Sequence, residues 1–351
     1  MEEIIIKKDE NTKMDLNKKC FRFELATKIE IKIGYNYSIK KVIDLPKERI
    51  GIIYEIKDNE CLFFIYSSKT FAKITEFQGC YFDVAKMKDN NLILCDEYNI
   101  YDFELIDNEY KLLQKIQCYE KIEENENYSH GNFTTKISFI YPLKNKDLIV
   151  CSYDIMKIYK KENGKYIYYK TIYGKYPIQE IIEINLNTIV LFMIKIIETD
   201  NIVKEFNYCL SLFNIQNDEN KILVERRFFD YKIESRKIYL FKINNHLIAE
   251  YLRYLEIFDI EQNMKLINEQ KTYKYEIPLY HFVAELKNSF ILATKRDSFS
   301  YRSFVYQYED KSLKEYQEFP FNLDNTRIIK LKNNKLIIYS KDEIKLINIF
   351  G

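Results

Sequence analysis

Short apolar strands and polar turns recur along the whole chain and predict an all-β fold, namely a seven-bladed β-propeller of four-stranded antiparallel blades. Two observations support this prediction. The pattern repeats every 40 to 45 residues in its shortest form, which is the length of a four-stranded blade. No long window shows the i, i+3, i+4 apolar spacing of an amphipathic helix, whereas short alternating runs fill the chain.

The C-terminal stretch shows the repeating unit most clearly. Leu336–Tyr339 is a predicted strand, Ser340–Glu343 a polar turn, and Ile344–Ile349 the next strand. In each unit an apolar residue precedes the first turn; these residues are Leu45, Met87, Leu143, Ile184, Ile243, Leu286 and Leu331. They are 42, 56, 41, 59, 43 and 45 residues apart. The two long spacings predict an insertion at Glu120–Asn132 and another at Glu198–Asn207, the latter together with a longer tail at Gln216–Lys221.

The two ends of the chain are predicted to share one blade. The last unit stops at Gly351 after three strands, and Cys20–Gly34 supplies a spare strand near the N-terminus. We expect this strand to pair into the last blade and close the ring, which removes an open sheet edge. The prediction is one propeller domain over residues 20–351, preceded by a flexible or partner-docking tail over residues 1–19.

Composition argues against several classes of partner. The chain of 351 residues has 54 basic and 53 acidic residues, and its net charge is +1. Dedicated binders of nucleic acids or anionic membranes usually carry a basic excess, so neither is expected. Met1–Lys19 has no signal-peptide apolar region, and the apolar run Ile181–Ile197 is short and contains Glu183 and Lys195. We therefore expect a soluble cytoplasmic protein.

Cysteine and histidine show no metal-binding spacing. The cysteines are Cys20, Cys61, Cys80, Cys95, Cys118, Cys151 and Cys209. Their number is odd and no CxxC pair occurs, which favours buried free thiols over disulfides or zinc. His130, His246 and His281 are isolated and have no HExxH-type neighbours. We expect no metal.

No motif commits the chain to a reaction. A GxSxG nucleophile turn and the glycine-rich phosphate loops are missing from a sequence with seven glycines. The prediction is a non-enzymatic protein without a cofactor. Because a propeller can bring distant residues together, an enzyme with a site in the central channel stays an alternative.

Several strand ends resemble the WD-repeat family, whose repeat places a Trp-Asp pair late in the third strand after a turn that contains Asp. Tyr101-Asp102 and Phe258-Asp259 look like this pair with Trp replaced. Asp96 and Asp154 are similar to the turn Asp. Aromatic residues without the Asp occupy similar positions at Tyr66, Tyr159, Phe213 and Tyr306. The resemblance implies a rigid, non-catalytic platform that binds other proteins.

Arg226 and Arg227 form the sharpest local feature. Phosphoinositide-binding propellers carry a paired-arginine motif that ends in Gly, and adjacent residues of a strand point to opposite faces, so such a pair can serve two phosphate pockets. Here Phe228 stands in place of the Gly, with Lys232, Arg236 and Lys237 nearby. A phosphoinositide site is the alternative function and the one predicted membrane contact. If the two arginines bind no phosphate, we expect them to be surface residues that pair with Glu225 and Asp230.

The principal functional prediction is a protein-interaction scaffold in a larger intracellular complex, with partners that the sequence does not identify. Tyrosine supplies a large contact area at low entropic cost, and the chain has 31 tyrosines. The tyrosine-rich runs Lys165–Tyr176 and Tyr273–Phe282 are candidate interfaces. The polar insertion at Glu120–Asn132 is another place for partner binding.

Overall fold

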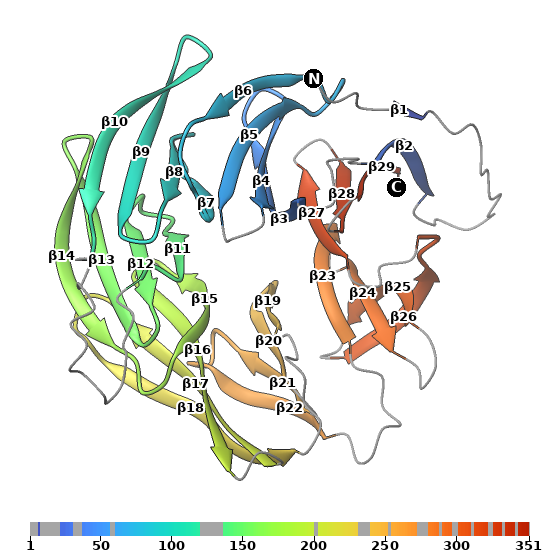
Figure 1. Cartoon of the computed structure of the whole chain (residues 1–351). Coiled ribbons are helices and arrows are strands. Elements are labelled where there is room, and N and C mark those ends of the chain that lie inside the picture. Colours follow the sequence, from blue (N-terminus) through green and yellow to red (C-terminus); the bar gives the residue numbers. More distant parts are fainter. Residues whose placement is uncertain are drawn as a thin grey trace. The chain divides into compact units, whose positions relative to one another are not determined.

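The structure is a computed structural model. It describes residues 6–7, 22–30, 37–56, 60–119, 136–199, 203–230, 239–251, 254–271, 280–287, 290–296, 301–309, 312–321, 326–331, 334–340 and 343–350. All regular elements of these residues are β-strands, and they form seven sheets (Figure 1). In the described part of the chain, no helix has the length and apolarity that crossing a membrane requires.

Each of the first three sheets contains four antiparallel strands in chain order. The first sheet is β3 (Tyr37–Leu45), β4 (Arg49–Ile56), β5 (Cys61–Ser67) and β6 (Lys73–Phe77). The second is β7 (Asp83–Lys86), β8 (Leu92–Cys95), β9 (Asn99–Ile106) and β10 (Glu109–Gln117). The third is β11 (Phe139–Pro142), β12 (Leu148–Ser152), β13 (Ile155–Glu162) and β14 (Lys165–Tyr173).

The next three sheets repeat this order. The fourth is β15 (Ile178–Asn185), β16 (Thr188–Thr199), β17 (Val203–Asn214) and β18 (Asn220–Asp230). The fifth is β19 (Tyr239–Ile243), β20 (His246–Tyr251), β21 (Tyr254–Asp259) and β22 (Lys265–Lys271). The sixth is β23 (Tyr280–Lys287), β24 (Phe290–Arg296), β25 (Tyr301–Glu309) and β26 (Ser312–Glu318). These six sheets confirm six of the seven predicted units.

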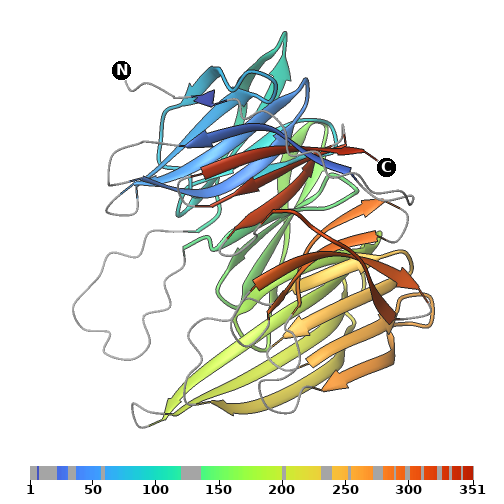
Figure 2. The same ribbon diagram turned by 90° about the vertical axis from the view of Figure 1, so that its right-hand side faces the viewer.

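The seventh sheet joins the two ends of the chain, as predicted. It contains β27 (Arg327–Leu331), β28 (Lys335–Tyr339), β29 (Glu343–Phe350), β2 (Arg22–Glu30) and the two-residue β1 (Ile6–Lys7). β2 pairs antiparallel with β29, and the blue and red strands lie side by side in Figure 2. Arg327 of β27 also donates a hydrogen bond of 2.7 Å to the backbone oxygen of Lys40 on β3.

The chain divides into two compact units, one of residues 1–44, 54–59 and 236–351 and one of residues 45–53 and 60–235. The fifth to seventh sheets belong to the first unit, and the second to fourth sheets to the second unit. The single domain over residues 20–351 stays a prediction. Apart from Ile6 and Lys7 in β1, the predicted tail over residues 1–19 lies outside the described residues.

The repeat anchors are core positions. All seven apolar residues that precede the first turns, from Leu45 to Leu331, are at most 3% exposed. Each lies in the first strand of its sheet or directly after it. Burial of a large aliphatic side chain contributes about 1.5–3 kcal/mol. The repeat in the sequence therefore arises because each sheet buries an apolar residue at the same position.

The long spacing in the fourth sheet has a different cause from the predicted insertion. β16 and β17 contain 12 residues each, and they pair from Thr188↔Asn214 to Thr199↔Val203. Most of Glu198–Asn207 is thus strand, in a hairpin longer than its neighbours (Figure 2). The other predicted insertion, Glu120–Asn132, lies outside the described residues.

A β-bulge interrupts the fourth strand of every sheet. The extra residues are Ile74, Leu113, Tyr169, Leu223, Ile267, Tyr316 and, in β2, Ala26. A bulge bends a strand and disrupts its ladder of backbone hydrogen bonds, which protects an edge from pairing with another chain. Contacts at these outer strands are therefore expected to use side chains.

Glu343 clamps the N-terminal strand to the C-terminal one. Its carboxylate contacts Lys28 of β2 at 2.8 Å and Lys345 of β29 at 2.9 Å. Partial burial raises the pKa of Glu343, but the two lysines outweigh this effect and hold the pKa below its usual value. The clamp therefore stabilises the fold above the unfolded-state pKa of about 4.3 and loses its effect as the pH falls through the lowered pKa.

We expect Glu343→Gln to speed amide hydrogen exchange in β2 at pH 7. The difference in exchange rate between the variant and the parent should shrink below about pH 4, where the parent carboxylate becomes protonated and is neutral like the Gln side chain. Hydrogen exchange with mass spectrometry measures both. Exchange that is unchanged at pH 7 would contradict the clamp.

Candidate interaction surface

Arg226 and Arg227 lie next to each other on β18 and pair with Tyr208 and Asn207 of β17. Arg227 makes a bidentate contact with the buried carboxylate of Glu205, from Nε to Oε1 at 2.6 Å and from Nη2 to Oε2 at 2.7 Å. This contact lowers the pKa of Glu205. A phosphate group would have to compete with Glu205 for the Arg227 guanidinium.

Of the two predicted partners of the arginine pair, Glu225 has a described side chain, and that of Asp230 lies outside the described residues. Arg227 binds Glu205 on the neighbouring strand, whereas Glu225 accepts hydrogen bonds from Lys175 at 2.7 Å and Tyr176 at 2.8 Å. The register of β17 and β18 places Glu205 and Arg227 close together, although they are 22 residues apart. The phosphate-binding role of Arg226 and Arg227 stays a prediction.

The predicted free cysteines are mostly buried. None of the six described cysteines is in a disulfide; Cys61, Cys95, Cys118, Cys151 and Cys209 are buried, and Cys80 is exposed. Cys20 lies outside the described residues, as do His130 and the side chain of His281. His246 of β20 lies 5.5 Å from the ring of Tyr308. Across the described ranges, no group of three or more His, Cys, Asp or Glu side chains could hold a metal ion.

Asp96 forms the turn between β8 and β9, as the resemblance implies. Its Oδ1 accepts hydrogen bonds from the backbone N–H groups of Tyr98 at 2.8 Å and Asn99 at 2.7 Å. Its Oδ2 accepts a hydrogen bond of 2.6 Å from the hydroxyl group of Tyr101. The Tyr101-Asp102 pair is thus linked to this turn through its tyrosine.

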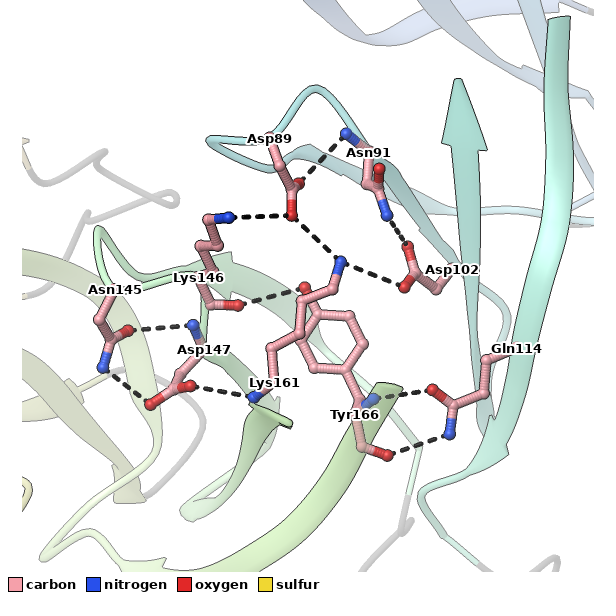
Figure 3. A network of polar contacts seen from close by, with 9 residues as sticks. All are labelled: Asp89, Asn91, Asp102, Gln114, Asn145, Lys146, Asp147, Lys161 and Tyr166. Atoms are coloured by element: carbon pink, nitrogen blue, oxygen red, sulfur yellow. Dashed lines mark hydrogen bonds and ion pairs between the residues drawn. The ribbon is translucent and has the colours of Figure 1, made fainter. Parts of the chain in front are cut away.

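Asp102, the second member of that pair, belongs to a buried polar network between the second and third sheets (Figure 3). Its side chain is 1% exposed and accepts a hydrogen bond of 3.1 Å from Nδ2 of Asn91. Lys161 of β13 lies 3.5 Å from Asp102 and 3.3 Å from Asp89. Burial raises the pKa of Asp102, and Lys161 opposes this rise.

Tyr166 and Gln114 extend the network to the outer strands (Figure 3). The Gln114 side chain of β10 accepts a hydrogen bond of 2.8 Å from the N–H of Tyr166 and donates one of 3.0 Å to its C=O. The hydroxyl group of Tyr166 donates to the backbone oxygen of Lys146 at 3.2 Å. The network therefore fixes one sheet against the next, and we assign it a structural role.

Exposed apolar and aromatic side chains concentrate on β14. Of the described side chains, β14 exposes four large ones, and no other fourth strand exposes more than two. The four are Ile167 at 51%, Tyr168 at 54%, Tyr169 at 40% and Tyr173 at 72%. The predicted tyrosine-rich interface at Lys165–Tyr176 is thus exposed at three of its five tyrosines. Most of Tyr273–Phe282 lies outside the described residues.

The hairpin of β13 and β14 has two unlike faces. Residues opposite each other in an antiparallel pair share a face, and the faces alternate along a strand. Lys161 and Tyr166 are opposite each other and contact the second sheet, whereas Lys160 and Ile167 are opposite each other on the other face. On that face Nζ of Lys160 lies 3.5 Å from the centroid of the Tyr169 ring.

We call the exposed residues Ile167, Tyr168, Tyr169 and Tyr173 the β14 surface. The sequence indicated its tyrosines, but it did not indicate Ile167 or the Lys160 contact. Alternation along residues 165–168 could have separated the two faces, but the bulge at Tyr169 breaks the alternation. The register of the hairpin is therefore needed to define this surface.

Comparisons with known proteins show similarity of fold. Neither protein-family models nor curated proteins match the chain. A structure of the RRP9 WD40 repeats is similar with a TM-score of 0.60 and 11% identity, over 94% of this chain and 100% of that one. A chain of a mitotic checkpoint complex structure has a TM-score of 0.61 and 8% identity, over 97% of this chain and 100% of that one.

An enzyme structure is similar as well. The dihydro-heme d1 dehydrogenase NirN has a TM-score of 0.51 and 9% identity, over 90% of this chain and 74% of that one. At such identities the similarity concerns the fold and not the activity. Together with the seven antiparallel sheets and the pairing of β2 with β29, it shows that the chain has the fold of a divergent WD40-like seven-bladed β-propeller.

Proposed function

We propose that this protein is a non-enzymatic scaffold that binds other proteins, as a subunit of a larger cytoplasmic complex. The observation that carries the proposal is the β14 surface. Large apolar side chains at 40% to 72% exposure on one strand are typical of a contact region, whereas single exposed residues are ordinary. Tyr and Ile together supply area and rigidity at low entropic cost.

The fold and the surrounding contacts support this proposal. A similar chain belongs to a mitotic checkpoint complex structure, so this type of propeller occurs in an assembly. The Asp102–Lys161 network holds β14 through Tyr166 and Gln114, so the surface is presented on a fixed strand. A preorganised surface loses less entropy when it binds a partner.

We expect the double variant Ile167→Ser, Tyr169→Ser to lose its stoichiometric partners. The measurement is affinity purification of the tagged full-length chain from its own cells, with quantitative mass spectrometry of the co-eluting proteins. The matched control is Ile74→Ser, Leu266→Ser, which changes two exposed apolar residues on the fourth strands of the first and fifth sheets. Because exposed positions change stability by only about 0.5 kcal/mol, both variants should fold.

Equal recovery of partners by the two double variants would contradict the role of the β14 surface. A parent chain that elutes alone at low salt would contradict the scaffold function itself. Thermal unfolding of each variant shows whether a lost partner reflects a lost contact or a lost fold.

A further inference from the structure

We infer that Cys61 and Cys80 form a redox-reactive dithiol that peroxides convert into a reversible disulfide. Cys61 begins β5 of the first sheet, and Cys80 lies in the connection between β6 and β7. The backbone N–H of Cys61 donates a hydrogen bond to Sγ of Cys80 over 3.1 Å. Neither residue is in a disulfide in this structure.

The connection around Cys80 has a defined shape. Gly79 has a φ of +133°, a conformation that L side chains rarely adopt, and a Cβ there would lie 2.9 Å from the Tyr81 ring. The hydroxyl group of Tyr81 donates a hydrogen bond of 3.0 Å to the backbone oxygen of Gln78. Tyr81 is itself buried and packs edge-on against Tyr101 at 5.3 Å. These contacts hold the Cys80 thiol beside the start of β5.

The distance between the two residues suits a disulfide. The hydrogen bond of 3.1 Å and standard bond lengths place the two Cα atoms at most about 7 Å apart. Disulfides join Cα atoms that are usually about 4.4–6.8 Å apart. The Cα separation therefore allows a disulfide, which forms once the two side chains turn towards each other.

The exposure of the two thiols assigns their roles. Cys80 is exposed and meets the oxidant, whereas Cys61 is 1% exposed. The Cys80 thiolate attacks a peroxide O–O bond, which gives a sulfenic acid and releases water or an alcohol. The Cys61 sulfur then attacks the sulfenic sulfur and displaces water, so that two thiols and one peroxide give one disulfide and two hydroxyl products.

The other described cysteines are expected to react with peroxide more slowly than Cys80. Cys95, Cys118, Cys151 and Cys209 are all buried. Burial raises the thiol pKa of Cys118 and of Cys209 to about 11, and it raises that of Cys151 as well. Since the thiolate is the nucleophile, these residues react slowly near neutral pH. Disulfides of this type in reducing compartments are usually transient and redox-sensing.

The test uses the reduced full-length protein and hydrogen peroxide. After oxidation at pH 7.5, free thiols are blocked with N-ethylmaleimide, and the protein is digested without reductant and analysed by mass spectrometry. We expect one dominant linked pair of peptides, Cys61 with Cys80, which dithiothreitol separates. The oxidised form should also melt about 2–4 °C higher, because the bond closes a loop in the unfolded chain.

Variants separate this inference from its alternatives. Cys80→Ser changes an exposed residue, should fold, and should lose the linked pair. In the parent, iodoacetamide should alkylate Cys80 more than about tenfold faster than the buried thiols. Oxidation of Cys80 to sulfinic acid while Cys61 stays reduced would overturn the inference. So would a bond from Cys80 to another cysteine, Cys20 included, or oxidation of Cys61 in Cys80→Ser.

Discussion

Replacement of Lys161 by Met is expected to destabilise the protein by about 3–5 kcal/mol at pH 7. The ammonium group lies 3.5 Å from the Asp102 carboxylate, which is 1% exposed, and 3.3 Å from Asp89. Without it, a buried carboxylate loses its counter-charge between the second and third sheets. Urea unfolding followed by circular dichroism measures the change.

The loss should depend on pH in a defined direction. Burial raises the pKa of Asp102, Lys161 opposes this rise, and the lysine is absent from the variant. A raised folded-state pKa imposes a penalty that is complete above that pKa and disappears as the pH falls towards the unfolded value of about 3.9. The difference between parent and variant should therefore shrink on acidification.

Two further variants test the assignment to this pair. Lys161→Met, Asp102→Asn should recover part of the lost stability, because a neutral amide needs no counter-charge while its oxygen can still accept from Asn91. Lys165→Met, at an exposed lysine on β14, should change stability by less than about 0.5 kcal/mol. Equal losses for Lys161→Met and Lys165→Met would refute a specific role of the Asp102–Lys161 pair.

Replacement of Phe23 by Ala is expected to cost about 3–5 kcal/mol and to loosen the junction of the two chain ends. Phe23 on β2 is 7% exposed, and its ring meets that of Phe319 edge-on at 4.7 Å. It belongs to a cluster with Leu292 of β24 and Leu336 of β28, so one N-terminal side chain contacts both C-terminal sheets. Removal of the ring leaves a cavity among these residues.

Hydrogen exchange locates the effect. We expect faster exchange in β2 and β29, together with a lower unfolding midpoint in urea. Arg22→Ala removes the preceding side chain, which is 58% exposed and pairs with Glu24, and should cost no more than about 1 kcal/mol. A Phe23→Ala protein as stable as Arg22→Ala would show that β2 adds little to the fold.

Periodicity made the architecture predictable. The seven residues from Leu45 to Leu331 recur because each sheet buries one apolar residue at the end of its first strand. β14, observed at Lys165–Tyr173, lies within the tyrosine-rich run Lys165–Tyr176, where a polar hairpin turn and alternating residues are local signals of a strand. The role of β2 followed from a count, because the last unit had three strands and the N-terminus one spare strand.

Contacts between residues far apart in the chain were harder to predict from the sequence. The lysine that faces Asp102 is 59 positions further along the chain, and nothing in the sequence distinguishes Lys161 from Lys160 beside it. The side chains of these two neighbours lie on opposite faces of β13, so one is buried in a polar network and the other contacts an exposed ring. Likewise, Glu205 rather than Glu225 binds Arg227 because the β17–β18 register places it there.

By itself, the sequence determined the strand content, the sevenfold repeat and the joining of the two ends, because period, polarity and turn residues act over a few neighbouring positions. Only the tertiary structure decided which side chains of β14 are exposed, which carboxylate each cation meets, and that Cys80 lies beside Cys61. These features depend on strand register and on bulges such as that at Tyr169. A shift of one residue moves a side chain to the opposite face, and composition does not record it.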